Sequence, residues 1–257
     1  MDFTLSAEQL ELRTNVLAFA KDALDDATGD AEDGFRRDLW ARCGEFGILG
    51  LPVPEQYGGS GRDVLSTTIA MEALGYGCRD HGLLFSMHAH LWAVVAPLLA
   101  FGTEEQKARY VPGLADGTLV GAHGMSEPES GSDAYAMRAR AVKDGDCYVL
   151  DGTKTWVTNA PVADVFVVFA TVNPKRGMWG ATAFVIDKGT PGLSVSKPFR
   201  KLGLNGSPMG EVILDGCRIP ASARLGAEGQ GATIFNHSMG WERSCILASQ
   251  VGRMERQ

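Results

Sequence analysis

The hydrophobic positions of the first 118 residues repeat at the spacing of amphipathic helices. Leu12, Val16 and Phe19 lie three or four residues apart, and Ser6 with Gln9 forms a capping-box pattern just before them. Similar spacing recurs in four later segments, at residues 39–46, 66–74, 84–98 and 103–114, the last opened by a second capping box. The pattern predicts an all-helical domain over residues 1–118.

From about residue 119 the hydrophobic period changes to two, which is typical of strands. Short apolar runs occupy residues 147–158, 165–170, 181–186 and 211–214, separated by Gly, Pro and Asn. Asp151-Gly152 is a tight-turn signal and divides the first run into two strands. We expect an antiparallel β-barrel or sandwich domain over residues 119–227.

A helical pattern returns near residue 229 and continues to the end of the chain. One stripe of a single helix would carry Phe235, Met239, Glu242, Ile246 and Ser249. The sequence stops at Gln257 without a Gly cap or a Pro, as though cut inside a helix. A lone amphipathic helix cannot bury its apolar stripe. We therefore expect an α+β fold in which residues 228–257 are the first helix of a truncated C-terminal helical domain.

Glu242 places a carboxylate on this otherwise apolar stripe. Its neighbours one turn away carry no positive charge; they are Ser238, Met239, Cys245 and Ile246. Desolvation on such a face raises the pKa of a carboxyl group and makes it a useful base near neutral pH. Spacing alone favours the alternative that Glu242 reaches water, so the case for a catalytic base depends on motifs upstream.

Composition excludes several classes of function. The chain is 45% hydrophobic and 21% charged, and its formal charge of −7 argues against a nucleic-acid partner or an anionic membrane surface. The N-terminus lacks a signal-peptide pattern, and the longest apolar run, residues 91–101, is interrupted by Pro97. Five widely spaced cysteines without a CxxC predict no metal site and no disulfide framework. We expect a cytoplasmic protein without a membrane segment.

Two strings in the β portion suggest chemistry: residues 123–133, HGMSEPESGSD, and residues 155–160, TWVTNA. In the first string, Ser126 and Ser132 carry hydroxyls, and Gly131 has no side chain, so a ligand can approach its main chain closely. The ring edge and the pyrophosphate of a flavin cofactor both need such fixed donors at short range. In the second, Trp156 and Thr158 share one face of a strand, so an indole can cover an isoalloxazine while a hydroxyl bonds its reactive nitrogen. Alone, each string also fits an ordinary polar loop or a barrel-core tryptophan. Together they favour a flavin site.

With Trp241-Glu242-Arg243, these strings make the chain resemble the acyl-CoA dehydrogenase family along essentially its whole length. The resemblance implies bound FAD with contacts from His123, Met125, Ser126, Gly131, Ser132, Trp156, Val157 and Thr158. It also implies that Ser132 borders the substrate and that Arg243 orients the substrate or a loop. The chain departs from the family at His123, where many relatives have an aromatic residue, and at Ser130, where they have Ala.

The activity implied is α,β-dehydrogenation of an acyl thioester, with the α-proton taken by Glu242 and the β-hydride by flavin N5. The base is placed as in isovaleryl- and long-chain-type enzymes. Three further strings are similar to dehydrogenases that act on prolyl or hydroxymalonyl groups held on carrier proteins in secondary metabolism. They are SMGWER at residues 238–243, EALGYGCRDH at residues 72–81 and TNAPVAD at residues 158–164. The implied partners are an acyl thioester on CoA or a carrier protein, and electron-transfer flavoprotein or oxygen as acceptor. Full-length relatives are homo-oligomeric.

Two alternatives stay open on the sequence alone. A flavin-dependent monooxygenase of the same fold would not need a Glu at position 242. A truncated module that only binds a carrier protein would need neither the base nor the flavin.

Overall fold

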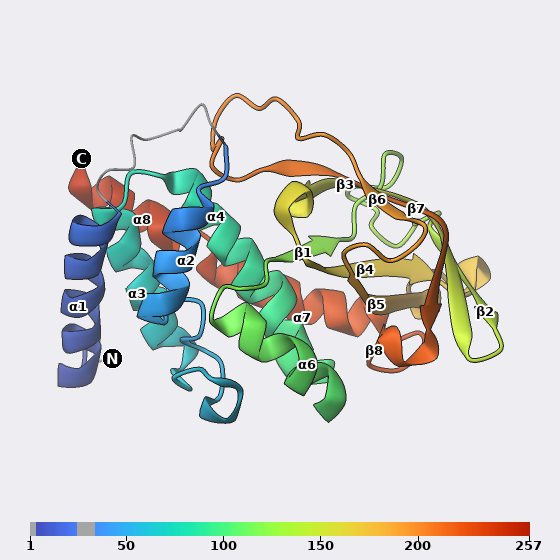
Figure 1. The fold of residues 1–257 in the computed structure, drawn as a ribbon, viewed down its shortest axis with the longest axis horizontal. Coiled ribbons are helices and arrows are strands. Elements are labelled where there is room, and N and C mark those ends of the chain that lie inside the picture. Colours follow the sequence, from blue (N-terminus) through green and yellow to red (C-terminus); the bar gives the residue numbers. More distant parts are fainter. Residues whose placement is uncertain (1–3, 25–33) are drawn as a thin grey trace.

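The first half of the chain is helical, as predicted. The computed structural model describes residues 4–24 and 34–257 (Figure 1). Its helices before the sheet are α1 Ala7–Ala23, α2 Arg37–Phe46, α3 Val64–Gly77, α4 His81–His90, α5 Ala96–Phe101 and α6 Glu104–Ala115. Both capping boxes are present: Ser6 and Gln9 close the start of α1, and Thr103 and Gln106 close the start of α6.

Helices α4 and α5 are parts of one long helix, joined by the π-helical turn η2, Leu91–Val95. Pro97 has no N–H to donate, which favours the wider turn just before it. The continuous helix, His81–Phe101, is long and apolar enough to cross a membrane, so the expectation that no segment has this length is wrong. However, 78% of its most apolar window is buried inside the structure, which is typical of a core helix.

The strands form one sheet. They are β1 Gly121–Gly124, β2 Arg140–Asp144, β3 Cys147–Thr158, β4 Val165–Thr171, β5 Ala181–Asp187, β6 Leu193–Val195, β7 Met209–Pro220 and β8 Arg224–Leu225. Their order is β6-β7-β3-β2-β4-β5-β8, with β1 pairing in parallel to β4. The predicted α+β class is confirmed, but the barrel or sandwich is wrong: the described strands make an open, mixed sheet. The outermost strands of the sheet, β6 and β8, have three and two residues, and each pairs with one neighbour, β7 and β5.

The predicted turn at Asp151-Gly152 is also wrong, because β3 runs unbroken through both residues. The register against β7 shifts between Leu150 and Gly152, so this dipeptide forms a bulge within a long strand. Gly152 has a φ of 143° there, and a Cβ at this position would lie 2.7 Å from Ala139. The hairpin turn itself is Gly145-Asp146, between β2 and β3.

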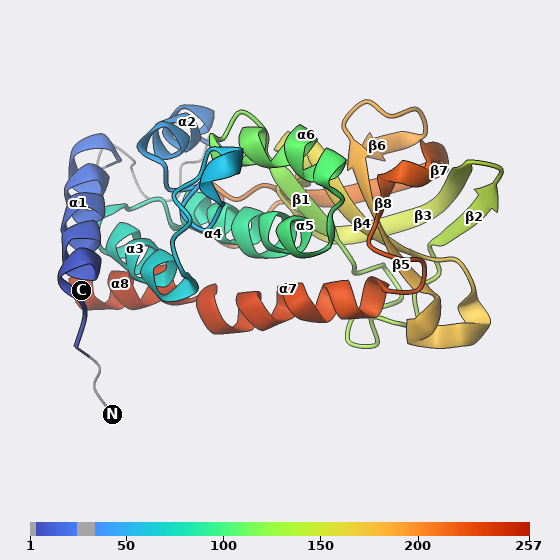
Figure 2. The same cartoon turned by 90° about the horizontal axis from the view of Figure 1, so that it is seen from below.

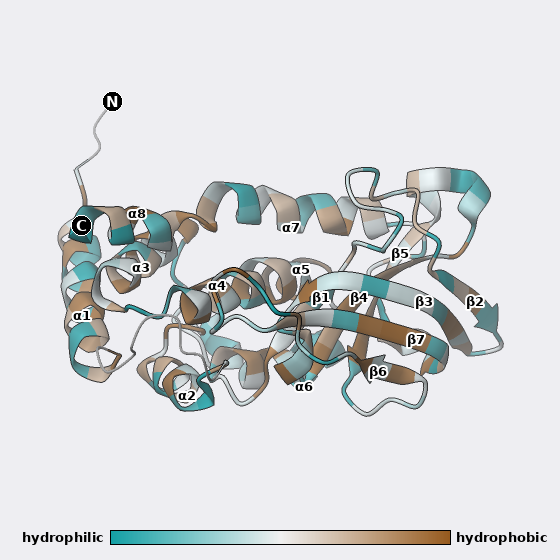
Figure 3. Ribbon diagram, turned by 90° about the horizontal axis from the view of Figure 1, so that it is seen from above, coloured by the Kyte–Doolittle hydropathy of each residue, from teal (hydrophilic) through white to brown (hydrophobic). Residues whose placement is uncertain are grey.

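The C-terminal segment is two helices instead of one. Helix α7, Gly231–Cys245, runs beside the long helix from the sheet toward the helical part, and α8, Ala248–Arg256, packs against α3 (Figure 2). Along α7 hydrophilic and hydrophobic residues alternate, as expected of an amphipathic helix (Figure 3). The break separates Ser249 from the stripe of Glu242, and the Ser249 hydroxyl instead lies 3.1 Å from Nε2 of His88. Division of the chain after residues 118 and 227 stays a prediction.

The hydrophobic core determines how the helices and the sheet pack against one another. One cluster lies among the N-terminal helices, and a second joins the long helix and α6 to β4 and β5. A third fills the other face of the sheet between β3, β4 and β7. All seven residues of β4 are buried, because both faces of this strand are covered. The first two clusters both include residues of α7 and of the long helix, so buried apolar side chains pack the junction of α7, the long helix and the sheet.

Candidate functional site

A cavity of about 250 Å³ lies at that junction. Each neighbouring element contributes short or polar side chains to it. The lining residues are Ala89 and Ala93 from the long helix, His123, Met125 and Ser126 from β1 and the segment after it, Thr155, Trp156 and Thr158 from β3, and Phe235, Met239 and Glu242 from α7. The cavity thus brings together six residues that the sequence analysis selected: His123, Met125, Ser126, Trp156, Thr158 and Glu242.

The other selected residues do not line this cavity. Gly131 and Ser132 are exposed in the segment between β1 and β2, and Arg243 is exposed on α7. Val157 is only 1% exposed and belongs to the core of the sheet, so only its main chain could serve a ligand.

The Glu242 carboxylate has no hydrogen-bonding or ion-pairing partner in the described part of the chain. Phe235 and Met239 stand on the same side of α7 and line the cavity with it. Burial raises the pKa of Glu242 to about 7, from an ordinary value of 4.5. The side chain can therefore exchange a proton near neutral pH.

A bulge near the end of β3 shapes the opposite wall. The register against β7 shifts between Lys154 and Val157, and Trp156 has a φ of 56°. Strict alternation would send Thr155 and Trp156 to opposite faces, whereas both line the cavity together with Thr158. The Trp156 side chain is 64% exposed and its ring lies 5.0 Å from that of Phe199. An apolar ring thus stands at the rim of the cavity.

His123 is held on the cavity wall by two phenylalanines. Its ring lies 5.1 Å from Phe169, steeply inclined, and stacks 5.9 Å from Phe235 at 14°. Burial, and then the positive charge of Lys154, lower the pKa of His123 to about 4, so the ring is neutral at physiological pH. Its Nε2 atom is buried and has no hydrogen-bond partner among the described residues. A buried polar atom without a partner is unusual, and this one belongs to a residue that lines the cavity.

Sequence reasoning missed a buried ion pair behind this wall. Nζ of Lys154 donates to Oε1 of Glu127 at 2.7 Å and to the main-chain oxygen of Met125 at 3.1 Å, and the Lys154 side chain is fully buried. Glu127 also accepts the main-chain N–H groups of Arg138 and Ala139, at 2.6 and 3.0 Å. The pair therefore ties β3 to both ends of the segment 125–139. The only local signal was a charged residue inside an apolar strand.

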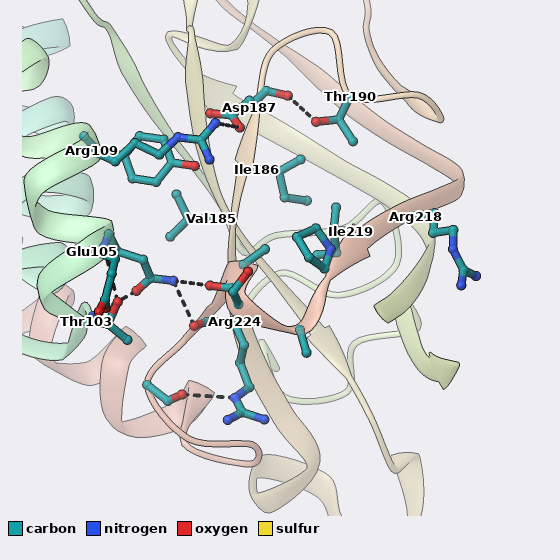
Figure 4. A pocket seen from close by; sticks show the side chains of 17 residues that line it. Thr103, Glu105, Arg109, Val185, Ile186, Asp187, Thr190, Arg218, Ile219 and Arg224 are labelled. Carbon is teal, nitrogen blue, oxygen red and sulfur yellow. Dashed lines mark hydrogen bonds and ion pairs between the residues drawn. The ribbon is translucent and has the colours of Figure 1, made fainter. Parts of the chain in front are cut away.

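Two larger cavities carry none of the selected residues. One of about 410 Å³ lies between α6 and the sheet, where Arg109 pairs with Asp187 at 2.7 Å and Gln106 donates to the main chain of Ser222 and Arg224 (Figure 4). The other, of about 440 Å³, lies beside Phe199. We assign the site to the smaller cavity because it alone among these three contains a carboxylate with a strongly raised pKa.

A helical part, an open sheet, and a cavity at their junction with a carboxylate that has no described partner define an α+β protein with a candidate catalytic site. Comparison with known sequences identifies its family. The family model for the N-terminal domain of acyl-CoA dehydrogenases matches residues 6–118, and that for the middle domain matches residues 122–217. The chain belongs to the acyl-CoA dehydrogenase family, as its motifs suggested.

Three similar proteins indicate which members of this family the chain resembles. The L-prolyl-[peptidyl-carrier protein] dehydrogenase of Pseudomonas fluorescens is 43% identical over 258 residues, which cover all of this chain and 68% of that protein. The crystal structure of the prolyl acyl carrier protein oxidase AnaB is 48% identical with a TM-score of 0.96, over 98% of this chain and 68% of AnaB. A structure of PigA with FAD and proline is 41% identical with a TM-score of 0.94, over all of this chain and 67% of PigA.

Proposed function

We propose that this protein catalyses FAD-dependent α,β-dehydrogenation of an acyl thioester, with Glu242 as the base that removes the α-proton. The observation that carries the proposal is the Glu242 carboxylate, without a partner in the described chain, on the wall of a cavity framed by a tryptophan and several hydroxyls. A thioester carbonyl acidifies its α-proton only modestly, so removal of that proton needs a positioned base. A carboxyl group with a pKa of about 7 suits this task near neutral pH.

The residues present fit a flavin. The buried Nε2 of His123 without a described partner and the largely exposed Trp156 ring both fit a flat polar heterocycle at the cavity. The hydroxyls of Ser126 and Thr158 can donate to its ring acceptors. When bound, FAD supplies the acceptor for the hydride that leaves the β-carbon.

We assign the flavin contacts as a set, following the family resemblance. They are the side chains of His123, Ser126, Trp156 and Thr158, the main chain of Met125 and Val157, and Gly131 and Ser132 from the exposed segment after β1. Trp156 and Thr158 line the same cavity, to which the bulge in β3 adds Thr155. Behind it, the Lys154 ammonium donates to the main-chain oxygen of Met125 and holds that segment in place.

Residues of the cavity and two exposed residues near it are assigned to the substrate. Glu242 accepts the α-proton, and Ala89 and Ala93 leave room for the acyl group because their side chains are short. Ser132 borders the substrate, and the exposed Arg243 orients its pantetheine arm or a neighbouring loop.

We propose a carrier protein, in preference to CoA, as the bearer of the acyl group. Two of the relatives described above are named for prolyl groups on carrier proteins, and they match 100% and 98% of this chain. The electron acceptor is electron-transfer flavoprotein or oxygen, and reoxidation under air with and without that flavoprotein distinguishes them.

Anaerobic bleaching of the flavin tests the proposal. The wild-type protein loaded with FAD should lose its visible absorbance when an acyl thioester is added. Glu242→Gln should keep the flavin but not bleach, whereas the exposed-site control Glu45→Gln should bleach as the wild type does. Undiminished bleaching by Glu242→Gln would remove this residue from the mechanism.

A further inference from the structure

The same pair of side chains occurs on both helices that meet at the cavity. His88 and Trp92 on the long helix are four residues apart, as are His237 and Trp241 on α7, so the members of each pair lie one turn from each other. In both pairs the indole Nε1 donates to a ring nitrogen of the histidine at 3.1 Å. The two indole rings stack across the interface between the helices, with centroids 6.3 Å apart and planes inclined by 30°. Two hydrogen-bonded His–Trp pairs therefore meet at one contact between the long helix and α7.

The hydrogen bonds determine where both histidines carry their protons. An indole N–H can only donate, so Nδ1 of His88 and Nε2 of His237 must be acceptors. Burial lowers the pKa of both rings, to about 3 for His88, so both are neutral near pH 7. His88 then carries its proton on Nε2, which donates to the hydroxyl of Ser249 on α8 at 3.1 Å. The Trp92 side chain, only 1% exposed, is thus anchored through His88 to a third helix.

Each tryptophan directly precedes a residue of the cavity wall. Trp92 is followed by Ala93 in the π-helical turn, and Trp241 is followed by Glu242. Because the Glu242 carboxylate has no hydrogen-bonding or ion-pairing partner in the described chain, its position depends on how α7 packs. The stacked indoles supply such packing at the residue next to Glu242, and the two histidines restrict rotation of the rings.

We infer that Trp241, held in place by His237, is a positioning residue that keeps the Glu242 carboxylate at its place on the cavity wall. This inference rests on the proposed function. A misplacement of about 1 Å in a reacting group can lower a rate about a hundredfold. Substrate binding depends on the whole cavity lining, which a small shift of α7 leaves largely intact. Loss of the Trp241 contact should therefore lower kcat much more than it raises KM.

A double-mutant cycle tests this role in the FAD-loaded protein, with L-prolyl pantetheine thioester as the probe. Trp241→Phe shortens the ring and removes its donor, and we expect kcat to fall by about tenfold or more while KM changes by less than about threefold. His237→Leu removes the acceptor and should also lower kcat, whereas His237→Gln supplies an acceptor oxygen and should recover most of that loss. Since His237 acts through Trp241, His237→Leu should cause no further loss in the Trp241→Phe background.

Ile234→Val is the matched control on the same helix. Ile234 is fully buried and belongs to a different core cluster from Trp92 and Trp241. Its replacement removes one methyl group, which should lower the stability of the folded protein and leave kcat unchanged. The absorbance of bound flavin, measured for every variant, reports whether the cofactor is retained.

The pH dependence of stability reports the position of Glu242 without any turnover. Burial raises the pKa of Glu242 to about 7, so Glu242→Gln should stabilise the protein at alkaline pH but not at acidic pH. In the Trp241→Phe background this alkaline gain should shrink, because the displaced carboxylate reaches water.

The two readouts separate failure of this inference from failure of the proposed function. A gain that shrinks in Trp241→Phe, in a protein whose flavin never bleaches with a thioester, would retain the positioning role and refute the dehydrogenase. An unchanged gain, a change in KM as large as that in kcat, or additive losses in the double variant would each overturn the positioning role.

Discussion

Replacing Glu242 by Gln should stabilise the folded protein at alkaline pH, because the folded state must hold an ionised carboxylate in a poorly solvated place. Its pKa of about 7, against an ordinary value of 4.5, measures that cost. Each pH unit between the two values corresponds to about 1.4 kcal/mol, so ionisation disfavours folding by up to about 3 kcal/mol. Gln has a similar shape and no charge, and removes this cost.

The effect has a defined sign and pH window. Below pH 4.5 the carboxyl is protonated in both the folded and the unfolded chain, so wild type and Glu242→Gln should be equally stable. As the pH rises from 4.5 to about 7, the unfolded chain loses this proton first, and the free energy of unfolding of the wild type falls relative to the variant. Above about 7 the difference should stay constant.

Urea denaturation of the two proteins at a series of pH values from 4.5 to 8.5 measures this difference. Glu11→Gln is the control, because Glu11 is exposed on α1 and its replacement should produce no comparable pH-dependent gain. A difference between Glu242→Gln and wild type that does not change with pH would show that Glu242 is well solvated. The argument for a desolvated base would then fail.

Three further outcomes follow from the geometry. The value of kcat/KM for an acyl thioester should rise about tenfold per pH unit below about 7 and level off above it, because only ionised Glu242 accepts a proton; a pH–rate profile checks this. Lys154→Met should lower the free energy of unfolding by about 3–5 kcal/mol because it leaves Glu127 charged and buried, and adding Glu127→Gln should recover much of the loss in denaturant titrations. Ala93→Leu should raise KM or abolish turnover while flavin absorbance and thermal stability persist, because the new side chain enters a cavity of only about 250 Å³; an unchanged KM would show that the acyl group lies elsewhere.

Features encoded within a few residues could be predicted from the sequence. The capping boxes at Ser6 and Thr103 depend on partners three residues away, and both are present. The lack of a cation one turn from Glu242 on its own helix was visible for the same reason, whereas the lack of a partner on the other cavity walls was not. Gly131, Ser132 and Arg243 were selected by motif alone, and the structure leaves them outside the cavity.

Features that depend on a distant partner could not be predicted this way. The bulges in β3 follow from its register against β7, and the Lys154–Glu127 pair joins residues 27 positions apart. The openness of the sheet follows from which strands pair at its edges, and local periodicity does not determine that pairing. Asp151-Gly152 has the composition of a turn, yet the pairing on both sides of β3 overrides that local preference.

Several different kinds of costly local feature occur on the walls of one cavity, and their combination supports the site independently of any family resemblance. Trp156 has a left-handed φ that a bulky residue rarely adopts, and Ala93 lies in a π-helical turn. Glu242 is a poorly solvated carboxylate without a described partner, and Nε2 of His123 is a buried nitrogen without one. Each of these features costs folding free energy. Positive φ values also occur at Asn159 and Leu204, which do not line the cavity, so no single feature marks the site. The combination of four such features on the walls of one cavity is expected where stability is lower in exchange for binding and chemistry.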